Sequence, residues 1–159
     1  MYQKNLSYWL KAVIIGVLVC LLGLYGFFIP MLGKRLTVLY PEYLSYYFPW
    51  LVLISLTAIP CLVILGFGWK IARNIGIGQA FSHSSALGCR AIAYLCFGDT
   101  LFFFAGNLLF LLLNKSHPAV LIASFLLLFV GVSLAVVFIT IGRLVDEAAL
   151  IQEENRMTI

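Results

Sequence analysis

The chain has 159 residues, of which 64% are hydrophobic and 10% are charged, and its mean hydropathy is +1.09. These values exclude a soluble globular domain. The formal net charge of +4 comes from basic residues scattered along the chain, which argues against direct binding of nucleic acid. The composition indicates an integral membrane protein that contacts membrane lipid along most of its length.

Four apolar runs, each bounded by charged residues, are long enough to cross a bilayer, which takes about 20 helical residues. With their helical flanks they predict spans at about 10–33, 45–70, 86–114 and 117–146. The polar connections between the runs are too short to bury a core of their own. The sequence therefore predicts one all-α membrane domain over residues 1–159, a four-helix bundle.

The orientation of the bundle follows from the basic residues in the short connections, because Lys and Arg favour the cytoplasmic side. The amino-terminal segment, the central loop and the tail together hold Lys4, Lys11, Lys70, Arg73, Arg90, Arg143 and Arg156. The other side holds Lys34, Arg35 and Lys115. We therefore expect both termini and the central loop to be cytoplasmic.

The connection between the first two spans, residues 34–50, is rich in aromatic side chains and contains Pro41 and Pro49. Aromatic residues gather at the headgroup region, where an apolar ring meets water at its edge. We expect this segment to lie on the bilayer surface and to start the second span irregularly. A ligand-binding vestibule built from the same aromatic residues is the alternative.

The central loop contains Gly76 and Gly78, followed by Phe81 and several serines. Glycines at this position favour the end of the second helix, and Ser82, Ser84 or Ser85 would cap the next one. We take Gly78, Phe81 and Ser82 as candidate contact residues on the cytoplasmic loop. A phosphate-binding loop is disfavoured because the third glycine of that motif is absent.

Past Arg143, apolar residues continue at helical spacing, at Leu144, Ala148 and Ile151. The fourth helix should therefore project into the cytoplasm by two or three turns, and residues 154–159 should leave it as an extended tail. This segment, residues 143–159, is a candidate partner-binding extension. Its candidate contact residues are Glu153, Glu154, Asn155 and Thr158. A solvated helix end without a partner is the alternative.

Asp99 is the acidic residue of the third apolar run, about 14 Å from the boundary at Arg90. Thr57, Pro60 and Ser133 are predicted at the same depth, and Pro60 leaves the Leu56 carbonyl without its helical partner. A charged carboxylate there is costly and no span offers a base, so Asp99 should hold a proton. It should then donate a hydrogen bond to Ser133, Thr57 or the Leu56 carbonyl. Its role is either structural, in holding the helices together, or functional, as a proton or cation site.

No segment carries a catalytic, metal or cofactor signature, since no nucleophile and base recur at a known spacing. The cysteines show no C-x-x-C pair and are expected to be reduced apolar filler: Cys20, Cys61, Cys89 and Cys96. His83 and His117 lie near opposite faces and are expected to be solvated in loops. We therefore expect neither an enzyme nor a cofactor.

Small residues recur on two spans, as Gly16 with Gly23 and Gly131 with Ala135. In lipid, small residues let helices approach closely, so both pairs predict helix contacts. Packing within one bundle is favoured over a dimerisation face, and a homo-oligomer is kept as the alternative.

Four short strings together resemble the bacterial membrane proteins grouped as domain of unknown function 2975. They are LYPE at 39–42, LTAIP at 56–60, GQAFS at 78–82 and ENRMTI at 154–159. The resemblance implies four spans in the bacterial cytoplasmic membrane, no known enzymatic activity, and a small helix-turn-helix regulator as a cytoplasmic partner. The chain departs from the pattern at Arg156 and Met157, and Asp99 is no part of it.

The sequence thus predicts a non-enzymatic membrane protein, a sensor or regulatory partner whose central loop and tail bind a cytoplasmic protein such as a transcription regulator. The alternative is a small proton-coupled transporter or channel centred on Asp99.

Overall fold

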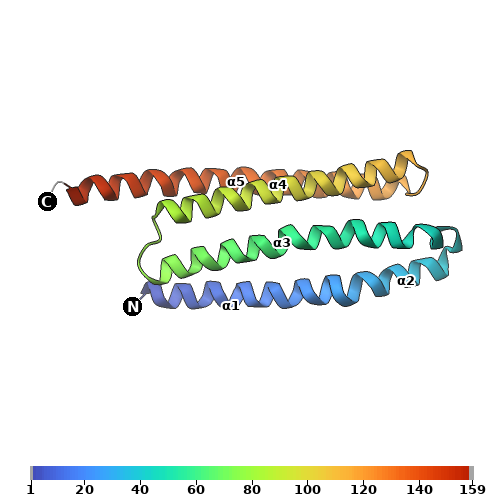
Figure 1. Cartoon of the computed structure of the whole chain (residues 1–159), viewed down its shortest axis with the longest axis horizontal. Coiled ribbons are helices and arrows are strands. Elements are labelled where there is room, and N and C mark those ends of the chain that lie inside the picture. The colour runs from blue at the N-terminus through green and yellow to red at the C-terminus, as the bar shows by residue number, and fades with distance from the viewer. Residues whose placement is uncertain (1, 158–159) are drawn as a thin grey trace.

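A computed structural model describes residues 2–157, except the side chains of residues 2, 3, 42, 43 and 155–157. Figure 1 shows two long helical hairpins lying along one another. The first consists of α1 (Tyr2–Gly23), the π-helical turn η1 (Leu24–Phe28), α2 (Ile29–Leu39), the 3₁₀ turn η2 (Pro41–Tyr46) and α3 (Tyr47–Gly76). The second consists of α4 (His83–Leu112) and α5 (Pro118–Met157).

Four helical stretches are long and apolar enough to cross a membrane: Lys4–Leu39, Leu44–Gly76, His83–Leu112 and Pro118–Glu154. Many of their large apolar side chains are exposed on the outside of the bundle, where hydrocarbon can cover them. This confirms the predicted all-α membrane bundle. Both ends of the chain lie at the same end of the bundle (Figure 1), as an even number of spans requires. Their cytoplasmic placement stays a prediction.

We call the end that carries the α3–α4 loop and both ends of the chain the loop end. The opposite end, where η2 and the α4–α5 turn lie, is the turn end (Figure 1).

The first connection is more helical than predicted. The helix does not stop near residue 33 but continues through η1 and α2 to Leu39, so within the connection 34–50 only residues 40–46 lie outside regular α-helix. Lys34 and Arg35 end the apolar run, yet both residue types are good helix formers, which is why hydropathy misplaced the boundary. Pro49 lies in the first turn of α3, where its missing N–H costs nothing.

The α3–α4 loop is built as the sequence predicts. Gly78 adopts a left-handed conformation with φ of 80°. Around it the Gln79 N–H donates to the Asn74 carbonyl at 2.9 Å and the Gly78 N–H to the Ile75 carbonyl at 3.1 Å, a Schellman end to α3. The Ser82 hydroxyl accepts from the Ser85 N–H and so caps α4.

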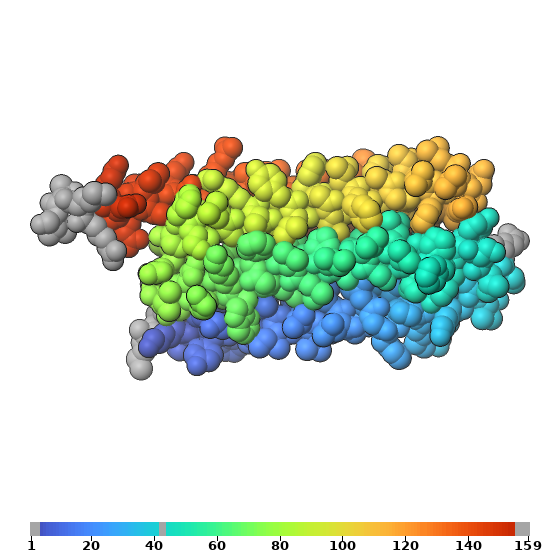
Figure 2. Space-filling view, in the orientation of Figure 1, coloured from blue at the N-terminus to red at the C-terminus, as the bar shows by residue number. Residues whose placement is uncertain are grey.

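α5 has 40 residues, and at about 1.5 Å per residue it is about 60 Å long, twice the hydrocarbon thickness of a bilayer. Its carboxyl end extends past the start of α4, as Figures 1 and 2 show. The prediction that residues from 154 onward form an extended tail is wrong as far as Met157, because α5 stays helical to that residue. Residues 143–157 contain no Gly or Pro that would end the helix. Thr158 lies outside the described residues.

The small residues of α5 pack as predicted and those of α1 do not. Ala135 is buried, and a Cβ at Gly131 would collide with the Thr100 side chain of α4. Around Gly16 and Gly23, in contrast, no atom lies within 4 Å of where a Cβ would be. Close helix contact is therefore confirmed for α5 and is wrong for α1 within this chain.

Candidate functional site

Four polar side chains from three elements meet near the middle of the bundle, and we call them the midplane cluster. Tyr25 comes from η1, Thr57 and Cys61 from α3, and Asp99 from α4. Thr57 and Cys61 are one helical turn apart and therefore share a face of α3. α3 lies between the other two elements, so this face can serve both Tyr25 and Asp99.

Hydrogen bonds within the cluster have assignable directions. The Thr57 hydroxyl donates to the Ile54 carbonyl at 2.7 Å, so its hydrogen is already used. The Tyr25 hydroxyl, 2.8 Å from Thr57 Oγ1, must then be the donor of that contact. On the other side, Cys61 Sγ donates weakly to Asp99 Oδ2 at 3.8 Å.

Two buried acceptors on α4 lack donors. Asp99 Oδ1 and Asn107 Oδ1 are both shielded and have no hydrogen-bond partner among the described residues. The Asn107 amide group donates to the Phe103 carbonyl at 2.9 Å, but its oxygen is unsatisfied although the residue is fully buried. Unsatisfied buried oxygens are rare in proteins and call for water, a proton or an ion.

Only part of the predicted midplane site comes together. Asp99 and Thr57 belong to the cluster, and Pro60 lies between Thr57 and Cys61 on α3. Ser133 does not belong, because it is exposed on α5 and donates to the Phe129 carbonyl of its own helix at 2.8 Å. Depth along a helix fixes the height of a residue but not the face on which it lies, and this explains the misplacement.

The partner predicted for Asp99 is also different. Within the described residues Asp99 contacts Cys61 and bonds neither Ser133, Thr57 nor the Leu56 carbonyl. Cys61 was expected to be apolar filler, and Tyr25 was not recognised as polar within the first span. A tyrosine in the middle of an apolar run was the available signal for it, since its hydroxyl needs a partner there.

At the loop end, buried polar contacts tie α3 to α4 and α1 to α3. Asn74 of α3 donates to Ser85 Oγ of α4 at 3.1 Å, and both residues are buried. Ser7 of α1 donates to the Ala72 carbonyl of α3 at 2.6 Å. These bonds fix the position of the α3–α4 loop relative to α1.

An ion-pair network links α4 to α5 at the same end. Asp146 Oδ2 accepts from the Arg90 guanidinium at 2.6 Å, and Asp146 Oδ1 lies 2.8 Å from His83 Nδ1. His83 was expected to be a solvated loop residue, so this contact was missed. The network lies where the apolar part of α5 ends and its extension begins.

The candidate contact residues for a partner lie on the surface of this end. Gly78 and Phe81 are exposed on the loop, with 58% of the Phe81 surface accessible, whereas Ser82 is engaged in the cap of α4. Glu153 and Glu154 lie on exposed turns of α5. The side chain of Asn155, and Thr158 as a whole, are outside the described residues.

Potential metal ligands do not gather anywhere in the described part of the chain, where no group of three His, Cys, Asp or Glu side chains forms a site. His83 and His117 lie at opposite ends of the second hairpin.

Comparison with known proteins identifies one family. The model of the family described as "Protein of unknown function (DUF2975)" matches residues 31–159. The chain is also 27% identical over 155 residues to "Uncharacterized membrane protein YoaS" of Bacillus subtilis (strain 168), covering 95% of this chain and 96% of that protein. No solved structure gives a significant match. With its four membrane-crossing helices, the chain is a multi-pass bacterial membrane protein that belongs to the DUF2975 family.

Proposed function

We propose that the protein is a non-enzymatic membrane protein that binds a cytoplasmic protein through the α5 extension, residues 143–157, together with the α3–α4 loop. The observation that carries this proposal is the continuation of α5 as a regular helix past the end of the bundle. A helix end that only closed the fourth span would have no reason to continue for about four more turns.

The extension exposes apolar side chains at the end of α5 that projects past the start of α4. Leu144 and Ile151 are seven residues apart on one face, Leu150 lies beside them, and about 60% of the surface of each is accessible. An amphipathic helix of this kind is the element that partner proteins bind in an apolar groove. Phe81 and Ile77, exposed on the neighbouring loop, extend the apolar surface at the same end.

The charges of the extension favour a basic partner. Its acidic residues Asp146, Glu147, Glu153 and Glu154 outnumber its basic residues Arg143 and Arg156, and Asp146 is paired with Arg90 of α4. A small DNA-binding regulator is basic as a class, and the family resemblance implies such a regulator as the partner. A protein that holds such a regulator at the membrane would act as its sensor or anchor, without itself contacting nucleic acid.

Co-purification with a small helix-turn-helix regulator from the same bacterium tests the proposal. Truncation after Gln152 removes Glu153 and the residues beyond it, and Ile151→Glu places a charge on the apolar face. Both changes should abolish co-purification. Val38→Ser, an apolar-to-polar change at an exposed site of the turn end, is the control and should retain it. If the truncated protein and Ile151→Glu both co-purify with the regulator as well as the wild type does, the extension is not the binding surface.

A second candidate function is proton-coupled transport or conduction through the bundle. The two unsatisfied oxygens favour it, because Asp99 Oδ1 and Asn107 Oδ1 are two turns apart on α4 and offer successive acceptors to a proton or cation. Asp99→Asn removes the ionisable group and preserves the shape of the side chain. In proteoliposomes loaded with a pH-sensitive dye, this variant should lose proton flux that the wild type supports. Equal flux in both proteins would end this candidate.

A further inference from the structure

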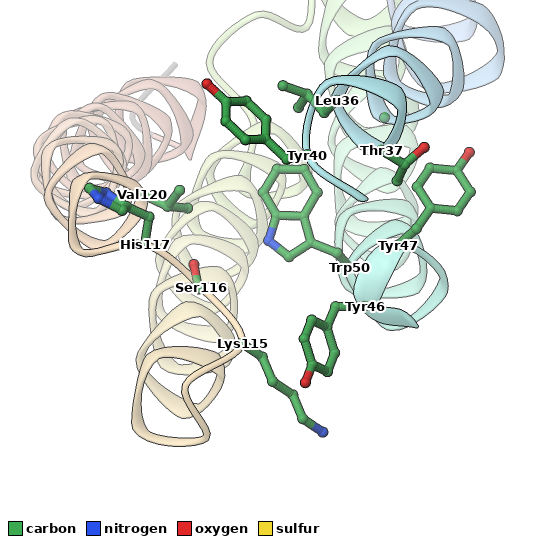
Figure 3. A pocket seen from close by; sticks show the side chains of 11 residues that line it. Leu36, Thr37, Tyr40, Tyr46, Tyr47, Trp50, Lys115, Ser116, His117 and Val120 are labelled. Carbon is green, nitrogen blue, oxygen red and sulfur yellow. The ribbon is translucent and has the colours of Figure 1, made fainter. Parts of the chain in front are cut away.

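A pocket of about 730 Å³ opens at the turn end, between the two hairpins. Figure 3 shows aromatic side chains approaching it from the first hairpin, among them Tyr46 and Trp50, and the α4–α5 turn closing the other side with Lys115 and His117. Its volume lies within the range of about 300–1,000 Å³ that ligand sites occupy. The pocket lies at the boundary of the apolar runs, at the level of the lipid headgroups.

The aromatic wall is held in place by specific packing. The Tyr47 ring lies so close to Gly33 of α2 that any Cβ at position 33 would collide with it. The Tyr47 hydroxyl donates to the Pro30 carbonyl at 3.3 Å. α2 therefore fixes Tyr47, and the wall is present without a ligand.

Lys115 is placed by the end of α4. Asn114 adopts a left-handed conformation with φ of 55°, and the Lys115 N–H donates to the Phe110 carbonyl at 2.8 Å. The ammonium group lies 5.4 Å from the centre of the Tyr46 ring, across the pocket mouth. Both ion pairs of the described side chains are at the loop end, so Lys115 has no described carboxylate partner.

Two further donors line the pocket. The Trp50 indole N–H makes no hydrogen bond within the described part of the chain, although the side chain is half-buried. His117 Nδ1 accepts from the Ala119 N–H at 3.2 Å, so in the neutral ring Nε2 carries the hydrogen and is a donor. The pocket thus combines an apolar aromatic wall with N–H donors and one positive charge.

This combination selects the chemistry of a ligand. A cation would meet the charge of Lys115, and no acidic side chain lines the described pocket to offset it. A hydrocarbon would leave the Trp50 N–H without an acceptor, which is unfavourable because that side chain is partly buried. An amphiphile with an anionic, oxygen-rich head and an apolar body satisfies both parts.

We propose that this pocket binds an anionic phospholipid from the surrounding bilayer. The headgroup phosphate accepts hydrogen bonds from Lys115 and from the Trp50 N–H, and the upper part of an acyl chain packs on Tyr47 and Leu36. The bilayer supplies such molecules at the level of the pocket, and basic pockets between helices hold lipid headgroups in this way. The site is independent of the partner-binding surface at the loop end.

Native mass spectrometry of the full-length protein released from nanodiscs tests the proposal. The nanodiscs contain phosphatidylglycerol and phosphatidylcholine with matched acyl chains. Wild-type protein should retain phosphatidylglycerol in preference, and Lys115→Gln should weaken that retention by about fivefold, the effect of one basic residue near an anionic lipid. Trp50→Phe keeps the aromatic ring and removes the N–H, and it should cause a smaller loss. Lys34→Gln is the matched control, because Lys34 lies at the same end but lines a different hollow.

Several results would overturn the proposal. Equal retention of the two lipids by the wild type would remove the selectivity for an anionic head. An equal loss in Lys34→Gln and Lys115→Gln would show general attraction to charged lipid. If millimolar inorganic phosphate displaces phosphatidylglycerol from the wild type and Lys115→Gln abolishes this competition, the pocket is a site for free phosphate instead.

Discussion

The α4–α5 pair and the α1 helix are held in the bundle by different means. α4 and α5 contribute most of the buried apolar residues, and these are small or compact: Ala86, Cys89, Ile92, Ala93 and Ala135. Side chains of this size let the two backbones approach closely, so dispersion forces act along the whole interface. Within lipid, where the hydrophobic effect does not hold helices together, this is an effective way to join two spans.

α1, in contrast, buries none of its described apolar side chains. It packs on α3 through partly buried side chains such as Ile14, which lies against Gly68. Polar contacts add to this packing: the bond of Ser7 with the Ala72 carbonyl and the approach of the Lys11 ammonium to the Trp69 ring at 5.5 Å. Tyr25, in the η1 turn that follows, adds the bond to Thr57. The same bundle thus joins one pair of helices through fully buried small residues and attaches another through partly buried side chains and a few polar contacts.

Gly131→Leu should have the largest effect on stability. The added side chain meets Thr100, whose β-branched side chain has few alternative rotamers, so α5 must move away from α4. Overpacking of this kind costs about 1–3 kcal/mol. The matched control is Gly16→Leu on α1, where the space is open. Thermal unfolding in detergent should show a clear loss for the first variant and almost none for the second; equal losses would contradict the contrast between the two helices.

Tyr25→Phe should have an intermediate effect. It removes the donor to Thr57 and keeps the ring, at a cost of about 0.6 kcal/mol, the average for a hydrogen bond between membrane helices. Tyr94→Phe, at an exposed tyrosine of α4, is the control. The same unfolding measurement should place Tyr25→Phe below the wild type and Tyr94→Phe level with it. If Tyr25→Phe is as stable as the wild type, the hydrogen bond between Tyr25 and Thr57 does not contribute to holding the first membrane-crossing helix on α3.

Asp146→Asn should have the smallest effect. It breaks the contacts of α5 with Arg90 and His83, but these charged groups are accessible to water, and ion pairs of this kind contribute little to stability. The difference between the wild type and the variant should shrink further at high salt, because ions screen exposed charges. A large loss that is insensitive to salt would mean that α4 and α5 depend on this network more than on their close packing.

The sequence determines the number of spans because the length of each apolar run is set by bilayer thickness, and charges bound every run. It also predicts the two ends of the α3–α4 loop, because Gly78 and Ser82 end and cap helices through contacts with residues close to them in sequence. The midplane cluster was only half predicted. Asp99 and Thr57 are found from depth, but which faces of three helices meet depends on their packing, and this excluded Ser133 and brought in Cys61.

Contacts between residues far apart in the chain were missed for the same reason. Asp146 contacts His83 and Arg90 across 63 and 56 residues, and no local pattern around any of them indicates the others. The turn-end pocket was foreseen only as an aromatic vestibule. Lys115 joins it from the other hairpin, and the placement of that residue depends on how two hairpins lie side by side.

The π-helical turn η1 determines which face α2 presents to α3 relative to the face presented by α1. A π turn closes on the fifth residue ahead instead of the fourth, so it accommodates one residue more than an α turn. If the same five residues formed regular α-helix, which turns by about 100° per residue, all of α2 would be rotated by about 90° about its axis. Gly33 would then turn away from Tyr47. The additional residue in this turn therefore lets the first membrane-crossing helix present Tyr25 to Thr57 at mid-membrane and Gly33 to Tyr47 near the headgroups.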